Sequence, residues 1–221
     1  MSRIVLKVGG AVADEAATLA LALAERHELC IVHGAGPQIS AELERAGLEV
    51  AFHQGRRVTS AKALGVVRRS LAAVNSHVCQ TIGPRAVPLL GDQIGFRAVR
   101  VPELGHVGSP LPSRPAAVEN ALAAGLLPVV APLAVGPLNV NADEAAAALA
   151  IGLGADKLLF VTDVPGLLLG GMVASRIGVD EAERMLAAGE LGGGIVPKLH
   201  AAVVAARGGV DSTIGVTAVV A

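Results

Sequence analysis

Two short apolar runs near the start of the chain each end abruptly at glycine. The run 3–8 (RIVLKV) is followed by two glycines, and the run 29–33 (LCIVH) is followed by Gly-Ala-Gly at 34–36. A helix-like segment comes after each turn, so bare backbone N–H groups and a helix N-terminus are presented to an anion. Two such turns on neighbouring strands, with Lys7 inside the first strand, predict a site that holds two anionic groups together.

Composition excludes several classes of protein. The net charge is −1, and three Phe are the only aromatic residues, so binding of nucleic acid by a basic face with stacking rings is not expected. No apolar run reaches the roughly 18 residues of a membrane span, and the start has no signal-peptide layout. Cys30 and Cys79 lack CxxC spacing and the histidines lack metal spacing, so we expect reduced thiols and no protein metal ligand.

Apolar runs alternate with alanine-rich segments of helical spacing along the chain. This alternation predicts an α/β fold, with a mostly parallel central sheet covered by helices on both faces in a three-layer αβα sandwich. The expected strands are 4–8, 29–32, 87–90, 127–130 and 157–161. The expected helices are 14–25, 38–46, 61–81, 114–124, 142–153 and 181–188.

Three polar segments follow apolar runs and are candidates for the site. In the segment 138–144, alternation places Asn139 and Asn141 on one face, and Asp143 stands near a helix start, where a carboxylate also acts as an N-cap. Asp163 follows the run 157–161 and precedes a Pro-Gly turn, and it is also a good turn former. A third segment, 192–198, is a glycine-rich loop that enters a helix and places Lys198 in its first turns, where a lysine does not favour helix stability.

Together these segments resemble the amino acid kinase family over nearly the whole chain. Any one of the motifs is modest, but their shared order is highly specific. The matching segments are K-x-G-G at 7–10, H-G-x-G-P-Q at 33–38, G-x-R-V-T at 55–59, G-x-V-G at 105–108, N-x-N-A-D at 139–143, T-D-V-x-G at 162–166 and G-x-x-x-K at 194–198.

The resemblance implies phosphorylation of an acid by ATP. A carboxylate is ionised at neutral pH, so the reaction needs positioning and charge neutralisation rather than a general base. The resemblance assigns the lysines to the transferring phosphoryl group and the aspartates to holding them, while Mg²⁺ bridges the ATP phosphates. The implied catalytic residues are Lys7, Lys198, Asp143 and Asp163, and the implied phosphate-binding residues are Gly9, Gly10 and Gly34.

The family pattern also implies where each substrate binds. Arg57 is expected to bind the α-carboxylate, because a guanidinium can donate two hydrogen bonds to one carboxylate. Its neighbour Arg56 offers the same group, so residue type alone does not choose between them. We interpret His33 as a structural residue that bonds the turn. The other implied acid-binding residues are Ala35, Gly36, Asn139 and Asn141, and the implied nucleotide-binding residues are Thr162, Asp163, Gly166 and Gly194. Alanine at position 35 replaces a family glycine and would be strained if that position had φ > 0.

Within the family, the resemblance is greatest to members that phosphorylate the γ-carboxylate of N-acetyl-L-glutamate in arginine biosynthesis. It implies one domain of two lobes, with the acid and dimer contacts in residues 1–154 and the nucleotide in 155–221. Because the first strand begins at residue 3 or 4, the resemblance favours an arginine-insensitive homodimer over an arginine-inhibited hexamer with an added N-terminal helix. The expected reduced thiols and the start without a signal-peptide layout predict a cytoplasmic protein. The alternatives are a kinase of carrier-linked α-aminoadipate and a non-catalytic nucleotide-binding protein on the same fold.

Overall fold

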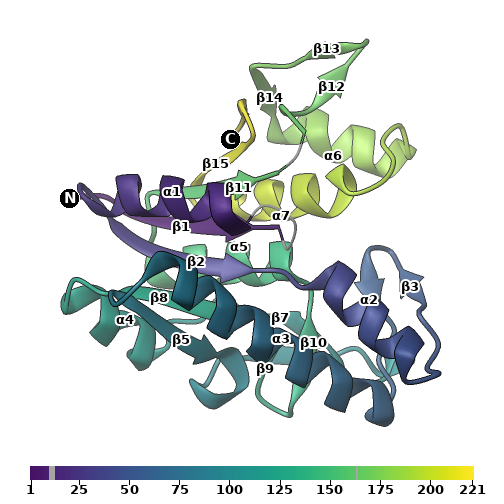
Figure 1. The fold of residues 1–221 in the computed structure, drawn as a ribbon. Helices are drawn as coiled ribbons and strands as arrows, with labels where there is room; N and C mark the ends of the chain where they lie inside the picture. Colours follow the sequence, from purple (N-terminus) through teal and green to yellow (C-terminus); the bar gives the residue numbers. More distant parts are fainter. Residues whose placement is uncertain (10–12, 163) are drawn as a thin grey trace.

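The computed structural model describes residues 1–9, 13–162 and 164–221. Within them, the largest sheet has eight strands in the order β14-β16-β15-β11-β1-β2-β8-β5 (Figure 1). The strands from β15 to β5 run parallel, while β16 is antiparallel to β15 and β14 follows the direction of β16. The bounds are β1 (Arg3–Val8), β2 (Glu28–His33), β5 (Ala86–Leu90), β8 (Leu127–Ala131), β11 (Lys157–Val161), β14 (Arg176–Gly178), β15 (Asp211–Ile214) and β16 (Thr217–Val220).

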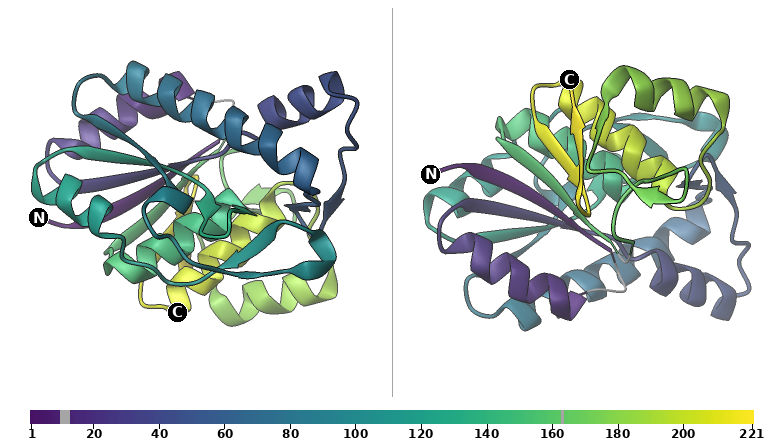
Figure 2. Two further views of the ribbon diagram at one scale, coloured as in Figure 1. Left: turned by 90° about the horizontal axis from the view of Figure 1, so that it is seen from below. Right: turned by 90° about the horizontal axis from the view of Figure 1, so that it is seen from above.

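The predicted three-layer sandwich is confirmed, and all five predicted strands are present as neighbours in the sheet. Helices α1 and α3 cover one face, and α4, α5 and α7 cover the other, with α6 packed on α7 (Figure 2). The bounds are α1 (Ala13–Ala24), α3 (Ala61–Ile82), α4 (Ala116–Ala123), α5 (Ala142–Leu153), α6 (Val179–Ala188) and α7 (Ile195–Arg207).

Alanine-rich helices reach the interior of the sandwich. Every residue of α5 from Ala145 to Ala150 is buried, because this helix lies between the sheet and α7. Side chains this small let two helices and a sheet approach closely without leaving voids. The central strands β1 and β2 are buried on both faces, which explains their continuous apolar runs.

Smaller elements surround the carboxyl ends of the central strands. Helix α2 follows β2. A second sheet has the order β6-β7-β10-β9, in which β6 and β7 precede β8 in the chain and β9 and β10 follow it. The sequence pattern missed this sheet because its strands are too short to show alternation. The bounds are α2 (Gly36–Arg45), β3 (Phe52–His53), β4 (Arg56–Arg57), η1 (Gly91–Gln93), β6 (Ala98–Arg100), η2 (Pro102–Leu104), β7 (Val107–Pro110), β9 (Leu133–Ala134), β10 (Leu138–Val140), β12 (Leu168–Leu169) and β13 (Met172–Val173).

Among the helices of the described residues, none combines the length and the apolar character that a membrane span requires.

Candidate active site

A buried carboxylate lies between two lysines that are far apart in the sequence. The Nζ atom of Lys7, on β1, is 2.7 Å from Oδ1 of Asp143, and both side chains are at least nine-tenths buried. The Nζ atom of Lys198, on α7, is 3.8 Å from Oδ2 of the same carboxylate. Because one carboxylate faces both ammonium groups, it offsets their mutual repulsion and fixes their separation. The two lysines therefore face one carboxylate from opposite sides.

The first turn of α5 leaves the carboxylate of Asp143 available for this role. The N-cap of α5 is Asn141, whose Oδ1 accepts hydrogen bonds from the backbone N–H groups of Asp143 and Glu144. The alternative interpretation of Asp143 as the helix cap is therefore wrong. Asn141 also donates from Nδ2 to the carbonyl of Gly55, so protein atoms engage both ends of its amide.

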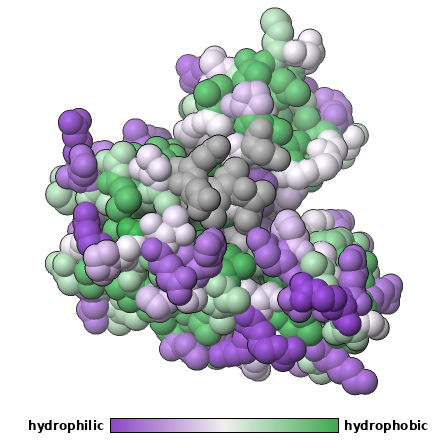
Figure 3. Space-filling view, viewed as in Figure 1, coloured by the Kyte–Doolittle hydropathy of each residue, from purple (hydrophilic) through white to green (hydrophobic). Residues whose placement is uncertain are grey.

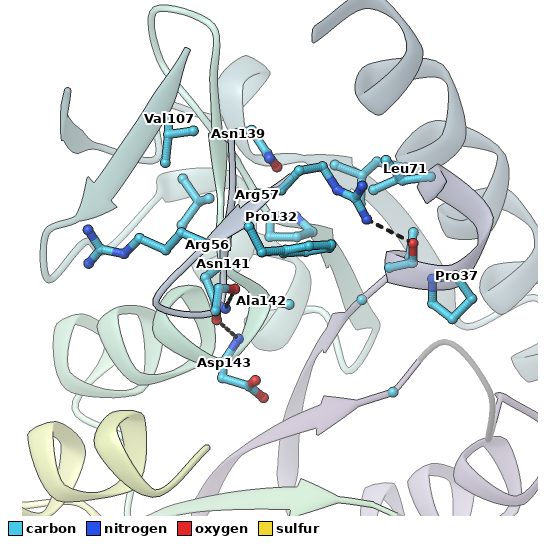
Figure 4. A pocket seen from close by; sticks show the side chains of 18 of the residues that line it. Pro37, Arg56, Arg57, Leu71, Val107, Pro132, Asn139, Asn141, Ala142 and Asp143 are labelled. Atoms are coloured by element: carbon cyan, nitrogen blue, oxygen red, sulfur yellow. Dashed lines mark hydrogen bonds between the residues drawn. The ribbon is translucent and has the colours of Figure 1, made fainter. Parts of the chain in front are cut away.

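A cavity of about 260 Å³ opens from Lys7 and Asp143 toward Arg57 (Figure 4). It contains most of the predicted acid-binding and phosphate-binding residues together with several apolar side chains. Its lining includes Lys7, Gly9, Gly34, Ala35, Gly36, Arg57, Leu71, Val107, Pro132, Asn139, Asn141 and Asp143.

Arg57 has the unsatisfied donor that an acid substrate would need. Its Nη2 donates to the carbonyl of Gly36 and to Oγ of Ser40, and its guanidinium lies 4.5 Å from the ring centre of Phe52. Its Nη1 is buried and has no hydrogen-bond partner among the described residues. Burial lowers the pKa of Arg57, yet the group stays cationic at neutral pH. A buried unpaired donor is costly unless a ligand accepts from it.

The structure also distinguishes the two neighbouring arginines, which composition left equivalent. Arg56 binds the carboxylate of Glu144 through two hydrogen bonds, of 2.8 and 2.9 Å. Its fork is therefore already occupied, whereas one nitrogen of Arg57 is not. This difference favours Arg57 as the group that meets the substrate.

His33 is a structural residue of the turn, as interpreted from the sequence. Asn75 donates from Nδ2 to Nε2 of His33 at 3.0 Å, so the ring proton lies on Nδ1, which is 3.4 Å from the carbonyl of Gly34. Burial lowers the pKa of His33 to about 4, so the ring is neutral near pH 7. Asn75 also donates to the carbonyl of Val129, which ties α3 to the sheet beside the turn.

The alanine in the second glycine turn does not need the left-handed backbone that favours glycine. Ala35 has φ −144° and ψ 29°, so φ is negative and the condition set for strain, φ > 0, is not met. Ala35 is the N-cap of α2, and the described residues provide no side-chain cap for this helix end, which faces the cavity. The N–H of Gly34 donates to the carbonyl of Val8 and is therefore already satisfied. Gly10 lies outside the described residues.

A short chain of hydrogen bonds connects Asn139 to the hairpin of Arg57. Asn139 donates from Nδ2 to Oγ1 of Thr59, and this hydroxyl donates to the carbonyl of Arg57. Thr59 is fully buried, so its hydroxyl is held in one place. Sequence reasoning assigned no role to Thr59, Ser40 or Phe52, because their importance arises only from contacts across distant segments.

A second cavity of about 480 Å³ lies on the other side of Lys198. Three of the four predicted nucleotide-binding residues, Thr162, Gly166 and Gly194, line it, and the fourth, Asp163, lies outside the described residues. A Cβ atom at Gly166 would lie 2.5 Å from Oγ1 of Thr217, so only glycine fits this turn. The apolar walls of this second cavity include Val164, Leu167, Leu168, Leu191 and Ile195.

The surface is hollowed between two groups of elements, β12–β14 with α6 on one side and α2 with β3 on the other (Figure 3). Lys198 lines the second cavity, and Asp143, which it faces, lines the first. The two cavities therefore adjoin at the lysine–aspartate–lysine cluster. This arrangement can hold two anionic ligands with their charged ends close together.

The two cavities adjoin at a buried carboxylate between two lysines, beyond the carboxyl ends of parallel strands. This arrangement suits a kinase that transfers a phosphoryl group from ATP to a small acid. The chain belongs to the amino acid kinase family, whose model matches residues 2–215. Curated relatives named acetylglutamate kinase include those of Rubrobacter xylanophilus, 39% identical over 97% of this chain and 88% of the relative, and Roseiflexus castenholzii, 36% identical over 94% and 86%. The resemblance seen in the sequence is thereby confirmed.

Solved structures share the fold of this chain. The protein smu.665 from Streptococcus mutans UA159 has a TM-score of 0.88 and 27% identity, with 99% of this chain and 98% of that chain covered. Carbamate kinase from Giardia lamblia bound to AMP-PNP has a TM-score of 0.72 and 15% identity, with the same coverage. The latter likeness concerns the fold alone.

Proposed function

We propose that this protein transfers the γ-phosphoryl group of ATP to the γ-carboxylate of N-acetyl-L-glutamate, a step of arginine biosynthesis. The relatives named acetylglutamate kinase support this substrate. The observation that carries the chemistry is the single carboxylate of Asp143 within ion-pair distance of Lys7 and Lys198. The carboxylate of Asp143 thereby holds two ammonium groups at the point where the substrate carboxylate and the triphosphate must meet.

The acid binds in the first cavity. Its α-carboxylate accepts from the unpaired Nη1 of Arg57, and its γ-carboxylate points toward Lys7. Apolar walls at Leu71, Val107 and Pro132 accommodate the carbon chain and the acetyl methyl group. Asn139 lines the same cavity and contributes its amide to the acetamido group, as the resemblance implies.

ATP binds in the second cavity with its phosphates directed at Lys198. The walls of Val164, Leu168 and Leu191 provide an apolar slot for the base. The described residues contain no cluster of three or more His, Cys, Asp or Glu side chains fit to hold a metal ion. Mg²⁺ arrives with the nucleotide as MgATP, bound mostly by phosphate oxygens and water.

In the reaction, an oxygen of the γ-carboxylate attacks the γ-phosphorus while the bond from that phosphorus to the β,γ-bridging oxygen breaks. ADP leaves with the electron pair and an acyl phosphate remains. No proton is removed, because the nucleophile is already ionised. Lys7 offsets the electrostatic repulsion between the carboxylate and the triphosphate, and Lys198 stabilises the negative charge on the phosphoryl group while it is transferred. Asp143 holds both lysines in position.

ADP release measured with a panel of acids tests this proposal. The panel contains N-acetylglutamate, N-acetylaspartate, glutamate, aspartate, carbamate and carrier-linked α-aminoadipate, and hydroxylamine traps any acyl phosphate as a hydroxamate. We expect turnover with N-acetylglutamate and not with the unacetylated acids. Tight ATP binding without turnover of any acid would support a non-catalytic protein instead, and turnover of carrier-linked α-aminoadipate alone would support the lysine-pathway alternative.

Three further parts of the hypothesis remain predictions. Residues 1–154 are assigned to the acid and residues 155–221 to the nucleotide, the chain is expected to be a homodimer, and its site of action is expected to be the cytoplasm. Light scattering on the eluting peak of a sizing column tests the dimer, because a monomer would scatter as half the expected mass.

A further inference from the structure

The β3–β4 hairpin carries Arg57 but has little structure of its own. Each strand has two residues, and the two pair only with each other among the described sheets. The turn between them places Gln54 at φ 49° and Gly55 at φ 77°. A hairpin this short is not stable alone in water, so external contacts must set the position of Arg57.

Two adjacent residues of β4 point in opposite directions (Figure 4). Arg57 extends over the cavity, and Arg56 extends away toward Glu144 on α5. Nε and Nη2 of Arg56 donate to the two carboxylate oxygens of Glu144, and Nη2 also lies 3.3 Å from Oγ of Ser109. The side chains of Arg56 and Glu144 are 24% and 15% exposed, so this two-bond ion pair is largely shielded from water.

A second contact anchors the tip of the hairpin to the same helix turn. Asn141 donates to the carbonyl of Gly55, and Glu144 binds Arg56, so the two anchors flank Asp143 on either side in sequence. A Cβ atom at Gly55 would lie only 3.4 Å from Cβ of Pro197, the residue before Lys198. The hairpin is thus held against the helix turn that carries the central carboxylate, and its tip lies beside the helix that carries the second lysine.

We propose that the Arg56–Glu144 ion pair is a latch that fixes Arg57 relative to Asp143 and thereby sets the affinity for the acid substrate. The latch acts by positioning: neither of its charges is directed at the substrate, whose two ends meet Arg57 and the lysines. The inference rests on the proposed function for its substrate, but the latch itself is a property of the substrate-free protein. Without the latch, the hairpin moves and Arg57 occupies several positions. The affinity for the acid therefore falls, while the affinity for ATP does not change.

Four variants test the latch: Arg56→Gln, Glu144→Gln, the double variant, and the exchange Arg56→Glu/Glu144→Arg. We expect each single variant to raise KM for N-acetylglutamate about tenfold and to change KM for ATP less than twofold. The double variant should be no worse than the worse single, and the exchanged pair should recover part of the loss, as for residues that act as one unit. Arg207→Gln, which breaks an exposed pair with Glu183, is the matched control and should change neither constant.

Two results would overturn the proposal. Unchanged KM for the acid in both single variants would show that the latch does not set affinity. Recovery in the double variant to wild-type values would show that an unbalanced charge, and not a loosened hairpin, caused the loss.

Hydrogen exchange of the amides in 52–58, measured without ligand, separates failure of the latch from failure of the proposed function. We expect faster exchange in Arg56→Gln than in Arg207→Gln, and equal rates would refute the latch whatever the substrate. If the wild-type chain turns over no N-acetylglutamate, the proposed function fails, while the exchange result still decides whether Arg56 and Glu144 hold the hairpin.

Discussion

Lys7 and Lys198 face the same carboxylate from very different surroundings. Lys7 lies on a central strand, 6% of its side chain is exposed, and its Nζ is 2.7 Å from Oδ1 of Asp143. Lys198 lies in the first turns of a covering helix, 16% of its side chain is exposed, and its Nζ is 3.8 Å from Oδ2. Its Nζ also donates to the carbonyl of Gly194, at the glycine-rich entrance to that helix.

This difference separates a fixed cation from an adjustable one. Lys7 and Asp143 form a buried pair, so removing one partner leaves an uncompensated charge in the interior. Lys198 is less buried and its ion pair is longer, so a shift of its ammonium group disturbs the interior less than a shift of Lys7 would. We infer that the site combines a preset cation at Lys7 with a more adjustable one at Lys198, and four predictions follow from this contrast between fixed and adjustable groups.

The largest effect is expected at Asp143. Asp143→Ala leaves Lys7 buried without its carboxylate, and we expect a loss of about 3–5 kcal/mol in the free energy of unfolding. Urea denaturation followed by circular dichroism measures it. Asp180→Ala removes an exposed partner of Arg207 and should leave the denaturation midpoint nearly unchanged. If Asp143→Ala had the same denaturation midpoint as Asp180→Ala, Lys7 and Asp143 would not behave as a buried ion pair. That result would contradict the contrast between the two lysines.

Lys198→Ala should lose activity and keep its fold. We expect kcat to fall by about 10²–10³, comparable with removing one preorganised donor to a developing charge, with the melting temperature close to that of the wild type. Steady-state ADP release and calorimetry measure the two quantities. Lys62→Ala, which removes an exposed lysine at the start of α3, is the control. Unchanged turnover would remove Lys198 from the mechanism.

His33 extends the contrast to pH, because it too is fixed at the end of a central strand. Its folded pKa of about 4 lies below the unfolded value near 6.5, so the unfolded chain takes up the proton first as the pH falls. The neutral His33 ring contributes its full stabilisation above pH 6.5. As the pH falls from 6.5 to 4, this contribution to the free energy of unfolding decreases by about 3 kcal/mol. His33→Gln should flatten the decline in unfolding free energy between these pH values, whereas His77→Gln, on the exposed side of α3, should keep it. Parallel curves for the two variants would contradict the buried neutral ring.

Arg57→Ala should give the smallest effect, confined to the acid. Loss of a charge-assisted hydrogen bond to the α-carboxylate should raise KM for N-acetylglutamate about 10- to 100-fold and leave KM for ATP within twofold. Initial rates at varied concentrations of each substrate measure both constants. Arg100→Ala, an exposed arginine on β6, is the control. Equal changes in both constants would mean that Arg57 supports the site as a whole and does not bind the acid.

The sequence predicted the central sheet well because its strands are buried on both faces and carry continuous apolar runs. It also located Lys7 and Asp143, since each stands beside a run whose end is clear from its glycines or polar residues. It could not separate Arg56 from Arg57 on residue type, because the difference lies in what each side chain meets 88 or 21 residues away in the chain. The small second sheet and the β3–β4 hairpin were also missed, because strands of two to four residues show no period.

By itself, then, the amino-acid order determined the layers, the positions of the turns and which charged groups stand at their edges, since these depend on local runs and on the polarity of neighbours. Only the tertiary structure decided that Asn141 and not Asp143 caps its helix, that Asp143 lies between both lysines, and which arginine keeps an unpaired nitrogen. The physical reason is that ion pairing and burial are properties of three-dimensional neighbours. Residues 7, 143 and 198 meet only after the sheet and its covering helices have packed.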